Sequence, residues 1–270
     1  MQAECERKVL MRHTSFHFKA LVLLLAVSSA ASCIPIASSL SPSLTPSQPT
    51  APTSADTRLS PVTSTLSSYA FPMGINPSAR YLFYIHGKII EDQGVPAFSP
   101  DFGEYNYEGI LKAFQRHGFV VVSEQRPKNT DVKLYTQRLV NQVENLIDAG
   151  VPPSSVTVVG ASKGAVIAAL ASNLIRHPDL NYVLLGSCHP DMIRDWIASG
   201  ATLSGNVLSI YDFADDEFSG SCKDLFTLSE GRGLGRHAEI VLQVGMGHGV
   251  LYQPHDEWIL PAVQWANPAP

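Results

Sequence analysis

A serine between two glycines is the clearest chemical signal in this chain of 270 residues. The segment 160–164 reads G-A-S-K-G; it follows the apolar run VTVV and opens the Ala-rich run AVIAALASNLI. A strand, a sharp turn and a helix in this order would present the Ser162 hydroxyl above a sheet, as a nucleophile requires. The flanking glycines leave room for the two backbones. The alternative is a phosphate-binding turn, but neither G-x-x-x-x-G-K-[ST] nor G-x-G-x-x-G occurs in the chain.

Acidic residues and a histidine follow two later apolar runs. A serine hydroxyl is a poor nucleophile and needs a base that is oriented by an acid. The base candidate is His248 in GMGHGVLY, with His255 as the second choice. Among the acids of DFADDE, Asp215 lies far enough into its loop to turn towards His248, while Asp216 and Asp212 stay open. A solvated acidic loop is the alternative, and a calcium cluster is disfavoured because the Gly-containing spacing of a calcium loop is missing.

The elements that must position these residues alternate along the chain. Near-continuous aliphatic runs, typical of strands covered on both faces, are Tyr81–His86, Phe119–Ser123, Val156–Gly160, Tyr182–Gly186, Val207–Asp212 and Glu239–Gly245. The helix candidates between and after them are Val132–Ala149, Ala165–Arg176 and Trp258–Trp265. This alternation predicts an α/β fold, a mostly parallel sheet of about six or more strands with helices on both faces. The short stretch between Ser162 and Asp215 leaves no room for a large lid domain.

The segment 160–164, the Asp215 loop, His248 and the early YIHG together resemble a small α/β-hydrolase-fold serine hydrolase, over nearly all of the part predicted to fold. The resemblance implies that Ser162 is the nucleophile, that His248 is the general base and that Asp215 orients it. The function it implies is cleavage of an ester or related acyl bond through an acyl-enzyme. One alternative is a peptidase, thioesterase or acyltransferase, which would use the same triad. The other alternative is a catalytically silent protein that keeps this fold and acts as a binding module.

The same resemblance implies an oxyanion hole made by the backbone N–H groups of Lys163 and Lys88. His86 is expected to shape the loop after YIHG by hydrogen bonding, or is merely a histidine at a strand end. The segment 91–109 is predicted as a long loop whose aromatic side chains line the substrate pocket; the alternative is an ordinary surface loop. No cofactor or metal is implied, since Cys188 and His189 lack metal-site spacing.

The N-terminal segment predicts export. Lys8, Arg12 and Lys19 precede the apolar run ALVLLLAV and the small-residue stretch SSAASC, a pattern typical of a signal peptide over residues 1–32. A buried core helix is the alternative, and the run is shorter than the roughly 20 residues that span a bilayer. Met1 and Met11 both remain candidate starts.

Ala30-Ala31-Ser32-Cys33 resembles a bacterial lipobox, with Ala30 where Leu is usual, so Cys33 is predicted to carry a lipid. The Ser/Thr/Pro-rich segment 33–75 is predicted to be a disordered tether, followed by the hydrolase domain, 76–270. These features predict a lipoprotein facing the periplasm or cell exterior; a signal cleaved near Ala31 or Ser32 would instead leave a soluble periplasmic or secreted protein.

Charge limits the expected partners. The formal charge is −5 for the whole chain and −7 without residues 1–32. Such a chain lacks the basic face of a nucleic-acid-binding protein and does not attract anionic lipids. The expected partner is therefore a small acyl or ester substrate, and any membrane attachment would come from the lipid on Cys33.

The cysteines predict one disulfide. Cys5 leaves with the signal and Cys33 is assigned to the lipid, so Cys188 and Cys222 remain as an even pair in an oxidising compartment. Each follows one of two neighbouring predicted strands, within bridging distance at the same end of the sheet. A Cys188–Cys222 bridge would brace the Asp215 loop; two buried thiols are the alternative.

Overall fold

The structure is a computed structural model and describes residues 69–267. The predicted signal peptide, Cys33 and most of the predicted tether lie outside the described residues. Within the described part, no helix combines the length and the apolar character that crossing a membrane requires.

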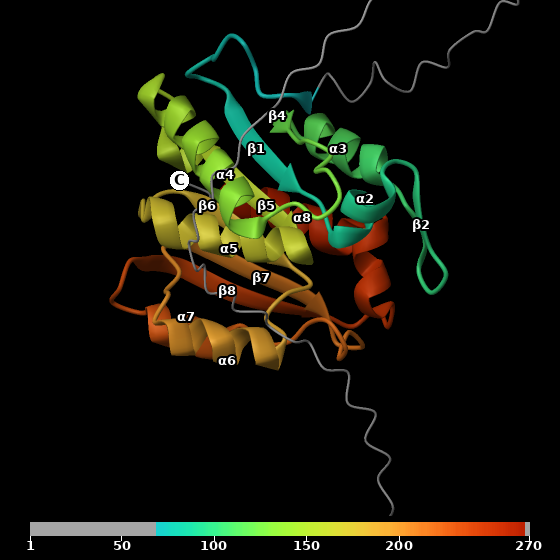
Figure 1. Ribbon diagram of the computed structural model, residues 1–270. Helices are drawn as coiled ribbons and strands as arrows, with labels where there is room; N and C mark the ends of the chain where they lie inside the picture. Colours follow the sequence, from blue (N-terminus) through green and yellow to red (C-terminus); the bar gives the residue numbers. More distant parts are fainter. Residues whose placement is uncertain (1–68, 268–270) are drawn as a thin grey trace, which may run out of the picture. The chain divides into compact units, whose positions relative to one another are not determined.

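A parallel sheet forms the centre of the described part (Figure 1). Its strand order is β4-β1-β5-β6-β7-β8. The strands are β1 (Arg80–Ile85), β4 (Phe119–Val122), β5 (Val156–Ala161), β6 (Asn181–Leu185), β7 (Gly205–Asp212) and β8 (Leu234–Leu242). Every pairing between neighbours is parallel. The prediction of a parallel α/β sheet is confirmed, and each predicted strand overlaps an observed one.

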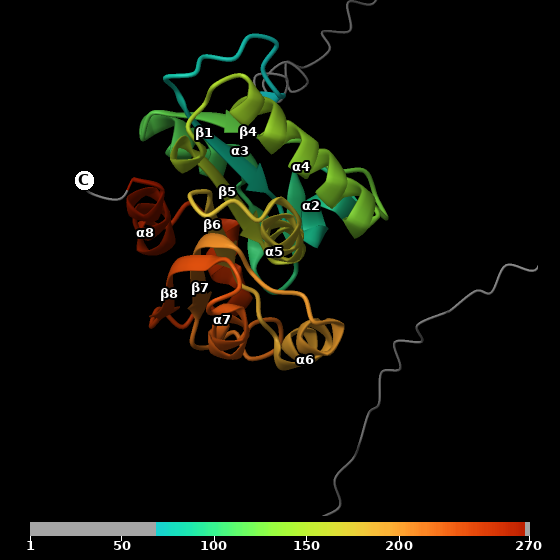
Figure 2. The same cartoon turned by 90° about the vertical axis from the view of Figure 1, so that its left-hand side faces the viewer.

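Helices cover both faces of this sheet, as Figures 1 and 2 show. Side chains of α3 (Tyr107–Arg116) and α8 (Asp256–Ala266) are buried against one face. The other face packs against α4 (Val132–Asp148), α5 (Lys163–Ile175), α6 (Pro190–Ser199) and α7 (Lys223–Ser229). Both faces are thus removed from water, which explains why the strands read as continuous apolar runs.

Helix α4 shows how the sequence produces these layers. Leu139, Val143 and Leu146 recur at helical spacing and are buried against the sheet. The helix begins after Asp131, whose side chain accepts a hydrogen bond from the N–H of Leu134 at 2.9 Å. Such a cap satisfies one of the amides that a helix leaves free at its start.

The prediction of a long loop over residues 91–109 is wrong in detail, because this segment contains a hairpin. Strands β2 (Ala97–Ser99) and β3 (Gly103–Tyr105) pair antiparallel in a separate two-stranded sheet. The segment begins inside the short helix α2 (Lys88–Gln93). Strands of three residues are too short to give an alternating pattern, so the sequence indicated only a loop.

The packed structure includes residues ahead of Asn76. Tyr69 is buried against the core, and its hydroxyl donates to the side chain of Gln115 at 3.0 Å. The carbonyl of Tyr69 accepts from the N–H of Ser123, directly after β4, at 2.8 Å. Through these contacts, the C-terminal end of the segment predicted as a tether packs beside the edge strand β4.

Candidate active site

Ser162 occupies a strained turn between β5 and α5. Its backbone angles are φ 53° and ψ −119°, a region that non-glycine residues rarely adopt. The N–H of Ser162 donates to the carbonyl of Leu185 at 2.9 Å, which ties the turn to β6. A Cβ on Gly164 would overlap with the carbonyl of Ile85, and one on Gly160 with the Gly164 backbone. Both glycines are therefore required by close packing, as the sequence motif indicated.

His248 and Asp215 meet at the carboxyl end of the sheet. Asp215 lies in the loop after β7, and His248 lies in η3 (Gly247–Tyr252), which follows β8. His248 Nδ1 and Asp215 Oδ2 are 2.7 Å apart. Because Nδ1 faces a carboxylate, that nitrogen carries the proton and Nε2 is left to accept one. The exposed fractions are 4% for Asp215 and 8% for His248, so the pair is sheltered from water.

Hydrogen bonds keep Asp215 ionised. Its Oδ2 also accepts from the hydroxyl of Ser219, and its buried Oδ1 has no hydrogen-bond partner among the described residues. Burial alone would raise the pKa of Asp215, but the hydrogen bonds from His248 and Ser219 and the charge of His248 outweigh it. The pKa of Asp215 is therefore lowered, and the carboxylate can stabilise a positive charge on the imidazole.

The other two acid candidates have different surroundings. Asp212 is fully buried and accepts from the N–H groups of Ala214 at 2.9 Å and Met246 at 3.3 Å. It thereby ties the Asp215 loop to the segment that leads to His248. Asp216 is exposed. Of the three carboxylates, Asp215 is the one that the structure brings to His248.

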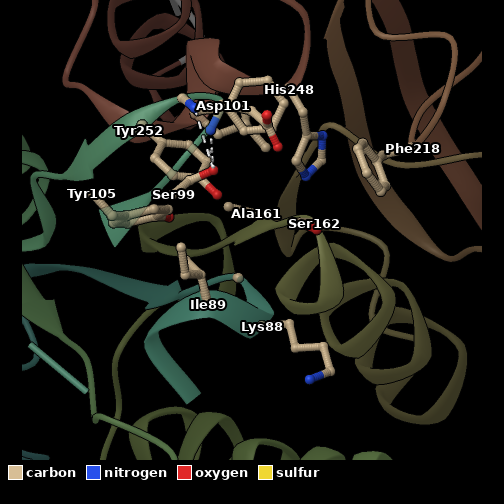
Figure 3. A pocket seen from close by; sticks show the side chains of 13 residues that line it. Lys88, Ile89, Ser99, Asp101, Tyr105, Ala161, Ser162, Phe218, His248 and Tyr252 are labelled. Atoms are coloured by element: carbon tan, nitrogen blue, oxygen red, sulfur yellow. Dashed lines mark hydrogen bonds between the residues drawn. The ribbon is translucent and has the colours of Figure 1, made fainter. Parts of the chain in front are cut away.

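Ser162 and His248 line the same cavity, of about 330 Å³ (Figure 3). Its other lining residues are Gly87, Lys88, Ile89, Ser99, Asp101, Phe102, Tyr105, Ala161, Phe218, Leu251 and Tyr252. No hydrogen bond joins Ser162 to His248 within the described residues. Since nucleophile–base hydrogen bonds often tighten only once substrate is bound, the shared cavity is the geometric link between the two side chains.

Lys88 and Lys163 stand at the starts of two helices beside Ser162. Lys88 is the first residue of α2 and Lys163 the first of α5. The first amides of a helix have no acceptor within that helix, so they can donate to a ligand. A Cβ on Gly87 would lie 3.5 Å from the Cβ of Ser162, which shows how closely the two turns approach. Lys88 lines the cavity together with Ser162, and Lys163 follows Ser162 directly in the chain; that their N–H groups form an oxyanion hole stays a prediction.

His86 lies beneath this loop and is fully buried. Its Nε2 accepts from the N–H of Arg126 at 2.9 Å, and its Nδ1 lies 2.8 Å from the carbonyl of Gly87. Burial, and then the nearby positive charge of Arg126, lower the pKa of His86 to about 3. His86 is therefore neutral and fixes the loop by hydrogen bonds, as the first of its two interpretations has it.

The segment 91–109 does line the cavity with aromatic side chains, Phe102 and Tyr105, and Ser99 of the same β2–β3 hairpin joins them. Sequence reasoning missed Phe218, which comes from the Asp215 loop. The aromatic prediction holds only for some side chains, since Phe98 is 61% exposed. The residues P-D-F between AFS and GEY, with their Pro and Asp, are the turn signal that could have indicated a hairpin.

The predicted disulfide is present. Cys188 and Cys222 are joined, with their Cα atoms 5.2 Å apart. Beside the bridge, Cys188 pairs with Ser219 in an isolated antiparallel bridge, and the N–H of Gly220 donates to the carbonyl of Ser187 at 2.8 Å. The disulfide therefore fastens the loop after β6 to the segment that carries Ser219, whose hydroxyl donates to Asp215.

Three other histidines of the described part lie on a strand or directly before a helix. His189 precedes α6, where its Nδ1 accepts from the N–H of Asp191 at 3.3 Å. His237 lies on β8, 3.7 Å from Glu230, and His255 precedes α8. Among residues 69–267, no group of three or more His, Cys, Asp and Glu side chains could hold a metal ion.

Three observations agree with one fold: the strand order, the serine turn after a central strand, and the chain order Ser, Asp, His. The chain has an α/β-hydrolase fold. No protein-family model and no curated protein sequence matches it. Solved structures do.

SOBER1 from Arabidopsis thaliana is 12% identical with a TM-score of 0.48, over 70% of this chain and 98% of its own. A carboxylesterase from Mesorhizobium loti is 17% identical with a TM-score of 0.47, over 71% and 90%. An esterase from Pyrococcus furiosus is 12% identical with a TM-score of 0.46, over 79% and 97%. At these values the likeness assigns neither an activity nor a substrate to this chain.

Proposed function

We propose that this protein is a serine hydrolase that cleaves an ester or related acyl bond. The observation that carries the proposal is the buried His248–Asp215 pair, 2.7 Å apart, whose imidazole lines the same cavity as Ser162. An ionised carboxylate behind a histidine makes that histidine an effective base for a serine hydroxyl. The strained Ser162 turn supports the same role, since such strain is typical of functional positions.

In the proposed reaction, Ser162 Oγ attacks the carbonyl carbon of the substrate while His248 Nε2 takes the hydroxyl proton. The carbonyl oxygen becomes an oxyanion that accepts hydrogen bonds from the amides of Lys163 and Lys88. As the ester bond breaks, His248 returns its proton to the leaving alcohol, and the acyl group stays on Ser162. A water molecule, deprotonated by His248, then attacks the acyl-enzyme. His248 returns this proton to Ser162 Oγ as the acyl–oxygen bond breaks, and the carboxylic acid is released.

The cavity favours an apolar acyl ester. Ile89, Phe102, Leu251 and the two tyrosines of its wall present mostly carbon to the space beside Ser162. A second cavity of about 210 Å³ is also lined by Ser162 and by Phe218. Ser162 therefore lines two cavities, an arrangement that suits a substrate with a group on each side of its carbonyl.

A panel of 4-nitrophenyl esters of increasing acyl length tests this proposal. The wild-type protein should hydrolyse short and medium chains, and Ser162→Ala should abolish turnover while its circular dichroism spectrum is unchanged. Matched thioesters and peptides in the same panel would separate the esterase from the other acyl chemistries. Equal turnover by wild type and Ser162→Ala would contradict the proposal.

We also propose that the protein is exported and anchored through a lipid on Cys33. The sequence pattern before Cys33 supports this, and a disulfide is the form that cysteines take in an oxidising compartment. In a bacterial host, an alkyne-labelled fatty acid should be incorporated into the full chain but not into Cys33→Ser. Labelling of both forms, or of neither, would contradict the anchor.

A further inference from the structure

A group of three charged side chains that the proposed triad does not use, two of them buried, lies beside Ser162. Its members are Glu91 on α2, Lys163 on α5 and Arg126 in the segment after β4. The exposed fractions are 3% for Glu91 and 1% for Arg126. Burying charges is unfavourable unless they are paired and hydrogen-bonded, so this group calls for an explanation.

Glu91 holds three donors at once. Its Oε1 accepts from Lys163 Nζ at 2.6 Å and from the N–H of Thr130 at 3.0 Å, and its Oε2 accepts from Arg126 Nε at 3.3 Å. Lys163 Nζ also donates to the carbonyl of Thr130 at 3.0 Å. Lys163 Nζ thus has two acceptors, and Lys163 is not among the residues that line the cavity of about 330 Å³.

These contacts connect the two proposed oxyanion donors. Lys163 is the residue directly after Ser162, and Glu91 lies three residues after Lys88 on the same short helix. The Glu91–Lys163 ion pair therefore links the helix that begins with one donor amide to the helix that begins with the other. A distance fixed in this way is what an oxyanion hole needs, because its donors must be in place before charge develops.

Arg126 extends the link to the loop beneath the donors. Its Nη2 donates to the carbonyl of His86 at 2.5 Å, and its N–H donates to His86 Nε2. Since His86 in turn contacts the carbonyl of Gly87, the residue before Lys88 is held from below. The group has two cationic side chains and one anionic one, and its net positive charge favours a developing oxyanion.

We propose that Glu91 is a positioning residue that sets the oxyanion hole through Lys163 and Arg126. This inference rests on the proposed function, since it concerns the same site. It assigns to the side chain of Lys163 a role that is separate from its backbone N–H. Glu91 and Lys163 then act as one unit, and removing either should have much the same effect on catalysis as removing both.

The test uses Lys163→Met and Glu91→Gln, singly and together, in the full chain. Lys163→Met disturbs the fold less than Glu91→Gln, because Glu91 keeps Arg126 and Thr130 as partners. Lys163→Arg should restore part of the activity. The matched control is Lys112→Met, which removes an exposed ion pair with Glu108 at 3.0 Å on α3. Three quantities are measured for each variant: ester turnover, the inhibition constant of a trifluoromethyl ketone, and the fraction of active sites that a fluorophosphonate titrates.

We expect each single variant to lower kcat about 10- to 100-fold and to change KM less than about threefold. The trifluoromethyl ketone should bind more weakly by a similar factor, since its adduct with serine carries an oxyanion. The double variant should lose no more than the worse single one, and the control should match wild type.

The positioning role is overturned if Lys163→Met keeps the wild-type kcat and ketone affinity. It is also overturned if lower activity merely follows a lower fraction of titrated sites, as for a purely structural role. A wild-type protein that hydrolyses no ester and takes no fluorophosphonate overturns the proposed function instead, and this inference with it. If Glu91→Gln does not fold, Lys163→Met decides alone.

Discussion

The two sides of Ser162 are held in place by different means. On the base side, hydrogen bonds to Asp212 join the loops that carry Asp215 and His248, and the Cys188–Cys222 disulfide ties the Asp215 loop to the loop after β6. On the proposed oxyanion side, the two proposed donor amides begin helices that are joined by the Glu91–Lys163 ion pair. A histidine that gains and loses a proton needs a partner that responds to its charge. Donor amides need only to stay where they are.

The largest effect is expected from the base side. Asp215→Asn should lower kcat by about 10³- to 10⁴-fold, because an amide neither holds the correct imidazole tautomer nor stabilises its positive charge. The neighbouring Asp216→Asn is the matched control, since Asp216 is exposed, and it should keep wild-type turnover. Ester hydrolysis at saturating substrate checks both. If Asp215→Asn stays active, or if Asp216→Asn is inactive, the assignment of Asp215 as the acid is wrong.

The disulfide should have a smaller effect on turnover and a clear effect on stability. Replacing both Cys188 and Cys222 with Ser should lower the free energy of unfolding by about 2–5 kcal/mol. We expect turnover to fall severalfold, because Ser219 and Asp215 lose their covalent brace while the ion group on the other side is untouched. Urea unfolding and ester kinetics measure the two effects. Wild type treated with reductant should behave like the double variant. If the variant unfolds and turns over ester like untreated wild type, the disulfide does not brace the Asp215 loop.

The smallest effect concerns pH. Because the pKa of Asp215 is lowered in the folded protein, its ionised form adds stability above the unfolded pKa of about 3.9. That contribution is lost as the pH falls through the lower, folded value. The difference in unfolding free energy between wild type and Asp215→Asn should therefore be constant near neutral pH and shrink below about pH 4. Thermal unfolding across this range measures it, and a difference that grows with acidity would contradict the hydrogen bonds assigned to Asp215.

The base side is also the one that the sequence predicts best. Strands covered on both faces leave continuous apolar runs, and loops at the same end of a parallel sheet must lie together. That logic places the serine turn, the acidic loop after β7 and the His248 segment at one edge of the sheet. The choice of Asp215 over Asp212 depended on loop geometry, and the structure shows why it matters: Asp212 is occupied by the N–H groups of Ala214 and Met246.

The oxyanion side was far less predictable. Glu91 and Arg126 stand in the polar stretches KIIEDQG and EQRPKN, which read as solvated loop. Nothing in their local pattern shows that the two side chains are buried together, because the contact joins residues far apart in the chain. The β2–β3 hairpin escaped prediction for a related reason: its strands are too short for periodicity to identify.

Covalent labelling of the nucleophile tests the central claim most directly. The protein is incubated with a fluorophosphonate, and its intact mass and labelled peptide are determined. The account predicts one phosphonyl group per chain, attached to Ser162, with no label on Ser162→Ala and much slower labelling of Asp215→Asn. A wild-type protein that stays unlabelled, or that carries its label on another residue, would contradict it.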